Sequence, residues 1–238
     1  MTTNKYDSIY QELAKKIDQG IVKAEDILPS ENELSLQYET SRETVRKALN
    51  LLAQNGYIQK IRGKGSVVLN VEKMRFPVSG LVSFKELSKT LGRRTCTKVH
   101  EFGLIHPDPY LCKQLKAEPD DEIWRIIRSR EINGEHVILD KDYIYRKYVP
   151  MLTQEICENS IYEYIEDELG MKIGFAQKEF VVEACTDEDE KYLDRNGFDH
   201  IVVVRNFVFL EDATLFQYTE SRHRLDKFRF VDFARRGR

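Results

Sequence analysis

The sequence lacks the features that would place a protein in a membrane, around a metal ion or in an oxidising compartment. Among its 238 residues no run of about eighteen apolar residues occurs, which excludes a membrane-spanning helix. The start of the chain, MTTNKYDSIYQ, has no apolar signal-peptide core, so we expect a cytoplasmic protein. The four cysteines and five histidines are widely scattered, and their spacing predicts reduced thiols with no disulfide framework and no metal site. We also expect no bound cofactor.

The most informative stretch of the sequence runs from Leu28 to Leu69. Ser30 can cap a helix, and Glu33 completes a Ser-x-x-Glu capping box. After a short polar turn, Ser41 can cap a second helix, whose apolar positions form one buried stripe. The outward face of this second helix carries Arg42, Glu43, Arg46, Lys47 and Asn50. Two helices joined by a short turn predict a helix-turn-helix, whose second helix reads the major groove.

A basic hairpin follows the second helix. Tyr57–Ile61 and Ser66–Leu69 are predicted strands, joined by Arg62-Gly63-Lys64-Gly65. The glycines let the backbone approach a neighbour closely, and Lys64 can reach a phosphate or the minor groove. Taken alone, a helix with basic outer residues is usually a solvated surface. Two such helices, a turn and a basic hairpin, in this order, instead predict a winged helix-turn-helix that binds double-stranded DNA.

A strong net charge is also absent, since the formal total is only −3. The balance nevertheless differs along the chain. Residues 1–75 carry twelve Lys and Arg against ten Asp and Glu, a net +2, whereas residues 76–238 carry twenty-five against thirty, a net −5. From residue 41 to residue 64, six basic residues stand against the single acid Glu43. A small domain with one basic face on an acidic body is the pattern expected of a ligand-controlled repressor.

The motifs PSENEL, SRETVRKALNLLAQNGYI and RGKGSVV resemble those of the GntR family of bacterial transcription regulators. That family shares Leu-Pro-Ser-Glu, Ser-Arg-x-Thr-Val-Arg and a Gly-x-Gly wing. The resemblance implies DNA contacts from the second helix and the wing, with Ser30 and Glu31 near the DNA backbone. The predicted DNA-binding residues are Ser30, Glu31, Ser41, Arg42, Thr44, Arg46, Lys47, Arg62, Lys64 and Gly65.

The rest of the chain predicts a different kind of domain. We expect the DNA-binding domain over residues 1–69, a linker over 70–77 and a second domain over 78–238. Strands are predicted at Thr97–Leu104, Glu122–Ile132, His136–Tyr145, Lys178–Ala184, His200–Leu210 and Ala213–Ser221, and helices at Ser83–Leu91, Pro109–Lys116, Ser160–Leu169 and Asp187–Asp194. Tight turns at Asn133-Gly134 and Glu211-Asp212 favour an antiparallel sheet with packed helices, hence an α+β fold.

This second half resembles the effector-binding domain of the HutC-type branch of the GntR family, whose fold is related to chorismate lyase. The resemblance rests on Gly80-Leu-Val-Ser83-Phe84, an Arg-x-Arg strand, a Gly-Glu hairpin, a Ser-x-Tyr helix start and the closing run Gln217–Arg236. Taken together, the resemblances of the two halves cover essentially the whole chain. They imply a repressor of a trehalose-utilisation operon, with trehalose 6-phosphate as the effector. We also hypothesise that two copies form a homodimer through the C-terminal sheets and bind a palindromic operator.

Two arginines are the best independent indication of an anionic effector. Arg128 and Arg130 share one face of a predicted strand with Trp124, Ile126 and Ile132. Two guanidinium groups on an otherwise apolar face are costly to bury without partners. They lie roughly 7 Å apart along a strand. They could therefore close on one phosphate, which the planar fork of Arg fits well.

The alternative is that both arginines form salt bridges with carboxylates such as Asp140, Glu183 or Glu220, and the spacing alone does not decide between the two. The resemblance favours the phosphate. A two-residue turn would place Leu139 opposite Arg128, whereas one bulged residue would place Asp140 there. Because the family assigns a carboxylate here to sugar hydroxyls, we predict the bulged register with Asp140 in the pocket.

The other candidates each have an ordinary structural alternative. Ser83 and Phe84 open a helix, where free N–H groups favour an anion but also a simple cap. Ser160 and Tyr162 match the Ser-x-Tyr of the family, although Ser160 also fits a plain capping box. Glu220 and Arg222 share one face of the last long strand, where they could contact sugar hydroxyls or form an ion-pair network. The predicted effector site is Ser83, Phe84, Arg128, Arg130, Asp140, Ser160, Tyr162, Glu220 and Arg222.

Two alternatives to this function remain at the level of sequence. A lyase-like enzyme would use the arginines to hold an anionic substrate, but no nucleophile–base pair or metal-ligand set is found, and we do not expect an enzyme. A repressor of the same architecture could instead bind another effector, such as an amino-sugar phosphate, an amino acid derivative or a fatty acid.

Overall fold

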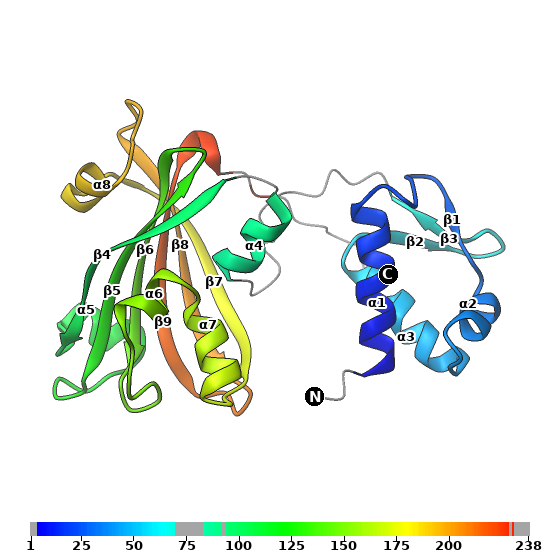
Figure 1. Cartoon of the computed structure of the whole chain (residues 1–238), viewed down its shortest axis with the longest axis horizontal. Coiled ribbons are helices and arrows are strands. Elements are labelled where there is room, and N and C mark those ends of the chain that lie inside the picture. Colours follow the sequence, from blue (N-terminus) through cyan, green and yellow to red (C-terminus); the bar gives the residue numbers. More distant parts are fainter. Residues whose placement is uncertain (1–3, 70–82, 92–93, 229, 231–238) are drawn as a thin grey trace. The chain divides into compact units, whose positions relative to one another are not determined.

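The computed structural model describes residues 4–69, 83–91, 94–228 and 230, which fall into two compact units (Figure 1). The first unit contains residues 4–69 and the second begins at residue 83. The linker predicted over residues 70–77, Gly80 and the end of the closing run lie outside the described residues.

The first unit is a winged helix-turn-helix, as predicted. Its elements are α1 (Lys5–Asp18), β1 (Ile27–Leu28), α2 (Glu31–Gln37), α3 (Arg42–Gln54), β2 (Ile58–Ile61) and β3 (Gly65–Val68). The Ser30 amide donates to Glu33 Oε2 at 2.8 Å, and the Glu33 amide donates to Ser30 Oγ at 3.3 Å. Ser41 Oγ likewise accepts from the Thr44 amide at 3.2 Å. Both predicted N-caps are therefore confirmed.

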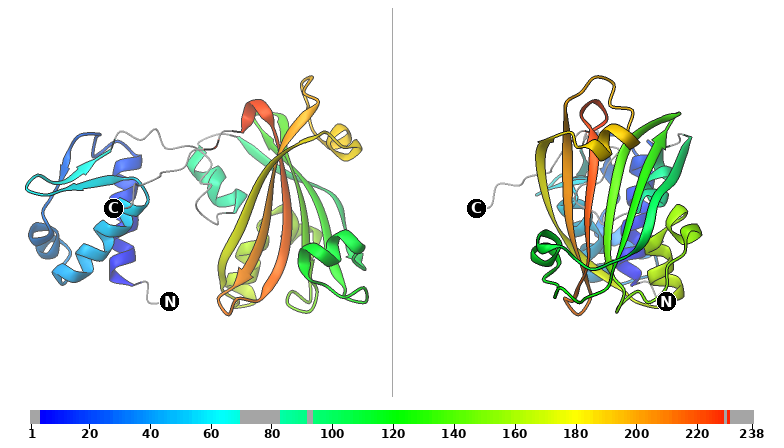
Figure 2. Two further views of the ribbon diagram at one scale, coloured as in Figure 1. Left: turned by 180° about the vertical axis from the view of Figure 1, so that it is seen from behind. Right: turned by 90° about the vertical axis from the view of Figure 1, so that its left-hand side faces the viewer.

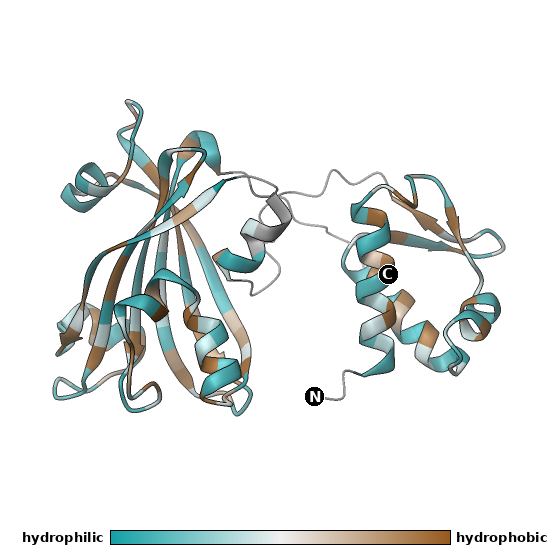
Figure 3. Cartoon of the chain, in the orientation of Figure 1, coloured by the Kyte–Doolittle hydropathy of each residue, from teal (hydrophilic) through white to brown (hydrophobic). Residues whose placement is uncertain are grey.

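One apolar core holds the first unit together. The predicted stripe of α3, Val45, Ala48, Leu49 and Leu52, is at most 1% exposed. It packs with buried residues of the other elements, namely Ile9, Leu13, Leu28, Leu34, Ile58 and Val68. In Figure 3 bands of apolar and hydrophilic residues follow one another along α1 and α3. Burial of this stripe turns the basic side of α3 outward.

The second unit is built on a six-stranded sheet. Its strands are β4 (Thr95–Ile105), β5 (Ile123–Ile132), β6 (Glu135–Tyr145), β7 (Ile173–Ala184), β8 (His200–Leu210) and β9 (Leu215–Arg224). They are ordered β4-β5-β6-β9-β8-β7, and every neighbouring pair is antiparallel. The right-hand view of Figure 2 shows the strands side by side, with β4 and β7 at the two edges. All six predicted strands and the α+β fold class are confirmed.

Helices cover both faces of this sheet. On the face called the site face below lie α4 (Phe84–Leu91), α6 (Gln154–Glu158) and α7 (Ile161–Glu163), which continues into the π-helical turn η1 (Tyr164–Glu168) (Figure 1). Cys157, Ile161 and Ile165 pack there against the strands. On the opposite face lie α5 (Pro109–Leu115) and α8 (Asp187–Tyr192), and a 3-10 turn, η2 (Leu225–Lys227), follows β9. Each face thus has its own apolar cluster.

The connections also follow the sequence. Asn133 and Gly134 form the tight turn between β5 and β6, with φ of 56° and 87°. These positive values are those of a type I′ turn, which explains the Asn-Gly pair. The second predicted turn, Glu211-Asp212, joins β8 to β9.

Candidate DNA-binding and effector sites

The predicted DNA-reading residues of α3 lie together on the outside of the first unit. Arg42, Arg46 and Lys47 are exposed, whereas the opposite side of α3 is buried. Thr44 lies beside the cap, with its hydroxyl 2.9 Å from Ser41 Oγ. Because α3 begins at Arg42, these side chains belong to its first two turns, the part of a helix-turn-helix that enters the major groove.

The wing presents its basic tip to solvent. Arg62, Gly63 and Lys64, which lie between β2 and β3, and Gly65, the first residue of β3, are all exposed. The φ of Gly65 is 105°, which a side-chain-bearing residue rarely adopts. Lys60 Nζ donates to Asn50 Oδ1 at 2.7 Å and so connects β2 to α3. This hydrogen bond connects the wing to the second helix of the helix-turn-helix within this unit.

The two residues expected near the DNA backbone are already engaged inside the protein. Ser30 Oγ accepts from the Glu33 amide in the capping box. The Glu31 carboxylate accepts from Arg46 at 3.2 Å. Both side chains therefore already have partners within the first unit.

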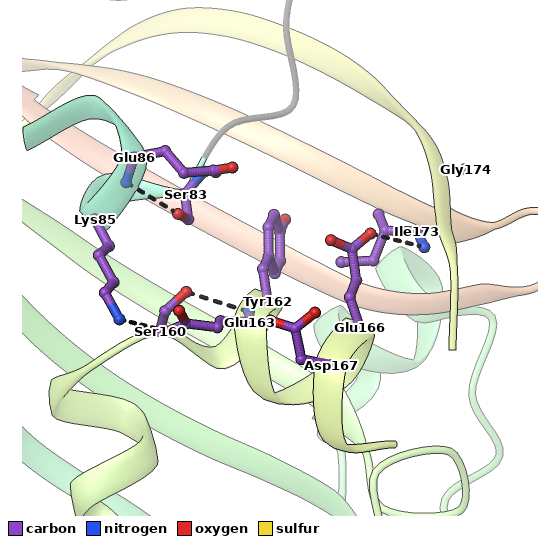
Figure 4. Close-up of a pocket in the computed structure, with 10 residues that line it drawn as sticks. All are labelled: Ser83, Lys85, Glu86, Ser160, Tyr162, Glu163, Glu166, Asp167, Ile173 and Gly174. Carbon is purple, nitrogen blue, oxygen red and sulfur yellow. Dashed lines mark hydrogen bonds and ion pairs between the residues drawn. The ribbon is translucent and has the colours of Figure 1, made fainter. Parts of the chain in front are cut away.

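A cavity of about 470 Å³ opens on the site face of the second unit. Three of the predicted effector residues, Ser83, Ser160 and Tyr162, line it. Figure 4 shows Ser83 at the start of α4 facing Ser160 and Tyr162 across the cavity. The rest of the lining is Lys85, Glu86, Glu163, Glu166, Asp167, Ile173 and Gly174. Residues far apart in the sequence thus form one polar hollow.

Arg128 and Arg130 lie on the same face, and each side chain is 6% exposed. Arg128 Nη2 donates to Asp142 Oδ2 at 2.6 Å, and its Nη1 donates to the Cys157 carbonyl at 2.9 Å. Arg130 Nε donates to Asp140 Oδ2 at 2.7 Å. The alternative of carboxylate partners therefore describes the structure, although Asp142 had not been among those named.

Arg130 connects these ion pairs to α4. Its Nη1 donates to Thr97 Oγ1 at 2.7 Å, and its guanidinium carbon lies 4.9 Å from the centre of the Phe84 ring. In the described part of the chain, Nη2 of Arg130 has no hydrogen-bond acceptor. Phe84 is thus placed beside Arg130. Among the described residues, the cavity lining does not include Phe84, Arg128, Arg130 or Asp140.

Electrostatics links the cavity to the arginines. Burial raises the pKa of Tyr162 above its ordinary value, and the Asp142 carboxylate adds to this effect. Tyr162 therefore keeps its proton and can donate a hydrogen bond. Burial alone would raise the pKa of Asp140, but Arg130 and Arg128 hold it below its ordinary value. Asp140 is therefore an ionised acceptor.

The bulged hairpin register is confirmed. Arg128 pairs with Asp140, and the register shifts between Arg130 and Glu131. Residues directly opposite each other in an antiparallel pair point to the same side of the sheet. Asp140 therefore shares the site face with Arg128, as predicted.

Glu220 and Arg222 are placed differently from the prediction. Arg222 pairs with Leu139, whereas Ser221 pairs with Asp140, so Glu220 and Arg222 point to the opposite face. There Arg222 donates to both Asp189 oxygens at 2.8 Å, and Glu220 accepts from a tyrosine hydroxyl at 2.8 Å. Their inclusion in one site with Arg128 is wrong, because strand alternation separates them. The ion-pair network, the other interpretation of this strand, describes them.

Several polar residues on the site face were not predicted. Asp142 lies two residues after Asp140 and accepts from Gln217 and Thr219, both at 3.0 Å. Ser221 donates to Asp140. The period-two pattern of β6 already places Asp142 beside Asp140. Gln217, Thr219 and Ser221 lie on β9, in contrast, and their place beside Asp140 and Asp142 can be predicted only when the strand order is known.

Two classes of feature are not found in the described ranges. None of the described helices is long and apolar enough to cross a membrane. Among the described side chains, no group of three or more His, Cys, Asp or Glu could hold a metal ion.

The comparisons with known proteins divide the chain in the same way. Residues 5–68 match the model of bacterial regulatory proteins of the gntR family, and residues 90–229 match the UTRA domain. Over 238 residues, 100% of both chains, the protein is 71% identical to the HTH-type transcriptional regulator TreR of Bacillus subtilis. It is 28% identical to the mannosyl-D-glycerate transport/metabolism system repressor MngR of Escherichia coli, over 97% of this chain and 96% of the relative.

The chain is also similar to solved structures of transcription regulators. The effector-binding domain of the B. subtilis trehalose repressor TreR is 71% identical, with a TM-score of 0.56 over 60% of this chain and 99% of that domain. The possible transcriptional regulator YydK of B. subtilis is 27% identical, with a TM-score of 0.80 over 98% of this chain and 100% of that one. The protein therefore belongs to the GntR family of bacterial transcription regulators, with an N-terminal winged helix-turn-helix and a C-terminal UTRA domain.

Proposed function

We propose that this protein represses a trehalose-utilisation operon and is released from its operator by trehalose 6-phosphate. The 71% identity to TreR over the whole chain supports the trehalose system. The observation that carries the effector is the placement of Ser83, Ser160 and Tyr162 around one cavity, on the same sheet face as Arg128 and Arg130. Chromosomal DNA is the other ligand, so the proposed repressor works in the cytoplasm.

The cavity suits a phosphorylated disaccharide. Its volume of about 470 Å³ lies within the range of ordinary small-molecule sites. We assign the phosphate to Nη2 of Arg130, because the planar fork of a guanidinium suits a phosphate. The start of α4 is already capped, since the Ser83 amide donates to Glu86 Oε2 at 2.6 Å and Ser83 Oγ accepts from the Glu86 amide at 3.2 Å. The acids Glu166 and Asp167 on η1 are suited to accept hydrogen bonds from sugar hydroxyls.

Binding at this position would change the surroundings of α4. A phosphate beside Arg130 competes with the Phe84 ring and the Asp140 carboxylate for the same guanidinium. Lys85 of α4 is also paired with Glu163 of α7, at the cavity wall. Occupation of the site therefore acts on α4, the first described element of the second unit.

We further propose that two copies act together on a palindromic operator. Two DNA-reading units joined in one dimer match the symmetry of such a site. A coupling free energy of only about 1–3 kcal/mol between the sites changes operator affinity roughly 5- to 150-fold. A modest preference of the effector for one arrangement of the dimer is thus enough for induction.

The effector is bound and released unchanged in this proposal. The named relatives are transcription regulators rather than enzymes. Incubation of the protein with trehalose 6-phosphate or chorismate, followed by product analysis, tests this directly. Product formed at catalytic turnover would contradict the proposal.

Operator binding in the presence of candidate effectors tests the function. Millimolar trehalose 6-phosphate should lower operator affinity at least about fivefold, whereas trehalose and glucose 6-phosphate should not. Arg130→Ala should abolish the response and keep effector-free DNA binding, because Arg130 lies outside the DNA-reading unit. Arg222→Ala, which removes another buried, ion-paired arginine from the opposite face of the same sheet, is the matched control. Unchanged affinity at millimolar effector would overturn the proposal.

A further inference from the structure

A carboxylate lies within the basic reading surface of the first unit. Glu31 is the first residue of α2, and its side chain is 26% exposed. Arg46 Nε lies 3.4 and 3.3 Å from its two oxygens, and Arg46 Nη2 donates to Oε2 at 3.2 Å. Lys60 Nζ, from β2, lies 3.9 Å from Oε1. One acid thus connects α2, α3 and the wing.

This carboxylate opposes general DNA binding. DNA presents a dense row of negative phosphates, and each acid near them weakens non-specific attraction. In the described part of the chain, Arg42 and Lys47 of the same helix form no salt bridge, so their charges are fully available to phosphates. Arg46 is the exception. Any favourable effect of Glu31 on DNA recognition must therefore come from its contacts with Arg46.

The hydrogen bonds of Arg46 leave a defined part of its guanidinium unused. A guanidinium has five N–H donors. Glu31 accepts from Nε and from one N–H of Nη2, and Glu43 accepts from one N–H of Nη1 at 2.9 Å. One N–H therefore remains on each terminal nitrogen. Two such donors can bond to O6 and N7 of one guanine.

We propose that Glu31 is a positioning residue for sequence reading. It holds Arg46 so that two terminal donors remain for a base edge, and it screens this arginine from the phosphates. Glu31 thereby increases the preference for operator over other DNA and lowers affinity for DNA in general. The inference rests on the DNA-reading role proposed for Arg46.

Two substitutions separate the charge of Glu31 from its reach. Glu31→Gln removes the charge with the same shape, and Glu31→Asp keeps the charge but withdraws it from Arg46. Affinity is measured by fluorescence anisotropy on the operator that the wild-type full-length protein selects from a random pool, and on a scrambled duplex of equal composition. Thermal unfolding of each variant confirms that the fold is retained.

The two variants should differ in a defined way. Glu31→Gln should bind the scrambled duplex about two- to fivefold more tightly at low salt, because one repulsive surface charge is gone. Glu31→Asp should bind it like the wild type. Both should lower the operator-to-scrambled affinity ratio about fivefold or more, the scale of one bidentate base contact. An unchanged ratio in both variants would overturn the inference.

A double-mutant cycle tests whether Glu31 acts through Arg46. In an Arg46→Ala background, Glu31→Gln should no longer alter the affinity ratio. If it still lowers the ratio by the same factor, Glu31 acts independently and the positioning role is wrong. Failure of the wild-type protein to select any operator would instead contradict the proposed function.

Discussion

Arg222 and Asp189 form an ion pair whose side chains are only 2% and 0% exposed. Removal of one partner from a buried pair leaves the other charge uncompensated. Arg222→Ala should therefore lower the free energy of unfolding of the second unit by about 3–5 kcal/mol. Urea unfolding followed by the fluorescence of Trp124, the single tryptophan, reports on this unit alone.

The exposed pair of Arg146 with Glu122 provides the control for that measurement. Their side chains are 43% and 49% exposed, so Arg146→Ala should cost at most about 1 kcal/mol. Folded Arg222→Ala protein should also retain its effector response, since Arg222 points away from the site face. If Arg222→Ala abolished the effector response with little loss of stability, Arg222 would belong to the effector site after all.

His223 makes the stability of the second unit depend on pH. Burial lowers the pKa of His223 to about 4, although the nearby Asp140 carboxylate opposes this. In the unfolded chain its pKa is about 6.5, so between these values the unfolded state binds the proton. The stability from neutral His223 is complete above pH 6.5. It is then lost, at up to about 1.4 kcal/mol per pH unit, as the pH falls towards 4.

A substitution of His223 isolates its contribution to the pH dependence of stability. His223→Gln should flatten the dependence of the unfolding free energy on pH between about 6.5 and 4, measured by urea unfolding with Trp124 fluorescence. Other groups also contribute to the pH dependence, such as His100, whose pKa is lowered by burial and by Lys98. Part of the slope of unfolding free energy against pH should therefore remain in the variant. A slope identical to that of the wild type would show that His223 is not the group responsible.

Single residues were predictable where one strand carries the whole argument. Arg128 and Arg130 lie on one strand, so the period of two was enough to place them on one face. The bulged register that brings Asp140 to that face was predicted from the family resemblance. Arg222 lies on a strand whose face is fixed by its pairing with β6, across a long stretch of chain. Alternation along β9 gives two sets of residues but does not say which set faces the arginines.

Gly174 determines how β7 begins. The β7–β8 register shifts between Ile173 and Phe175, and a Cβ at position 174 would lie 2.8 Å from the Leu210 carbonyl oxygen. Because that neighbour is backbone, it cannot move aside as a side chain would. Gly174→Ala should therefore destabilise the second unit by about 1–3 kcal/mol. It should also weaken effector binding, since Gly174 lines the cavity.

The matched control is a second strand glycine. A Cβ at Gly103, in β4, would meet nothing within 4 Å, so Gly103→Ala should be neutral or slightly stabilising. Chemical unfolding and effector titration of both variants provide the comparison. Equal effects of the two substitutions would show that close approach at Gly174 is not the cause.

Elements were predictable in proportion to their length. Each of the six long strands spans enough residues for alternation to be recognised. The two residues of β1 and the five of α6 are too few for any period, and both were missed. The π-helical turn η1 was predicted as α-helix, because hydrogen bonds to i+5 rather than i+4 leave no distinct pattern in the sequence.

At the scale of the whole molecule, the two units have separate cores, so the proposed DNA and effector sites lie in different compact units. Any control of one by the other is then a coupling free energy, and such coupling is reciprocal. If trehalose 6-phosphate lowers operator affinity by a given factor, saturating operator DNA must lower effector affinity by the same factor. Isothermal titration of the effector into free and operator-bound protein should give this factor. Arg130→Ala should remove both effects together. Unequal factors for the two ligands would mean that the effector also acts outside the one coupled site, for example by changing the association of two copies.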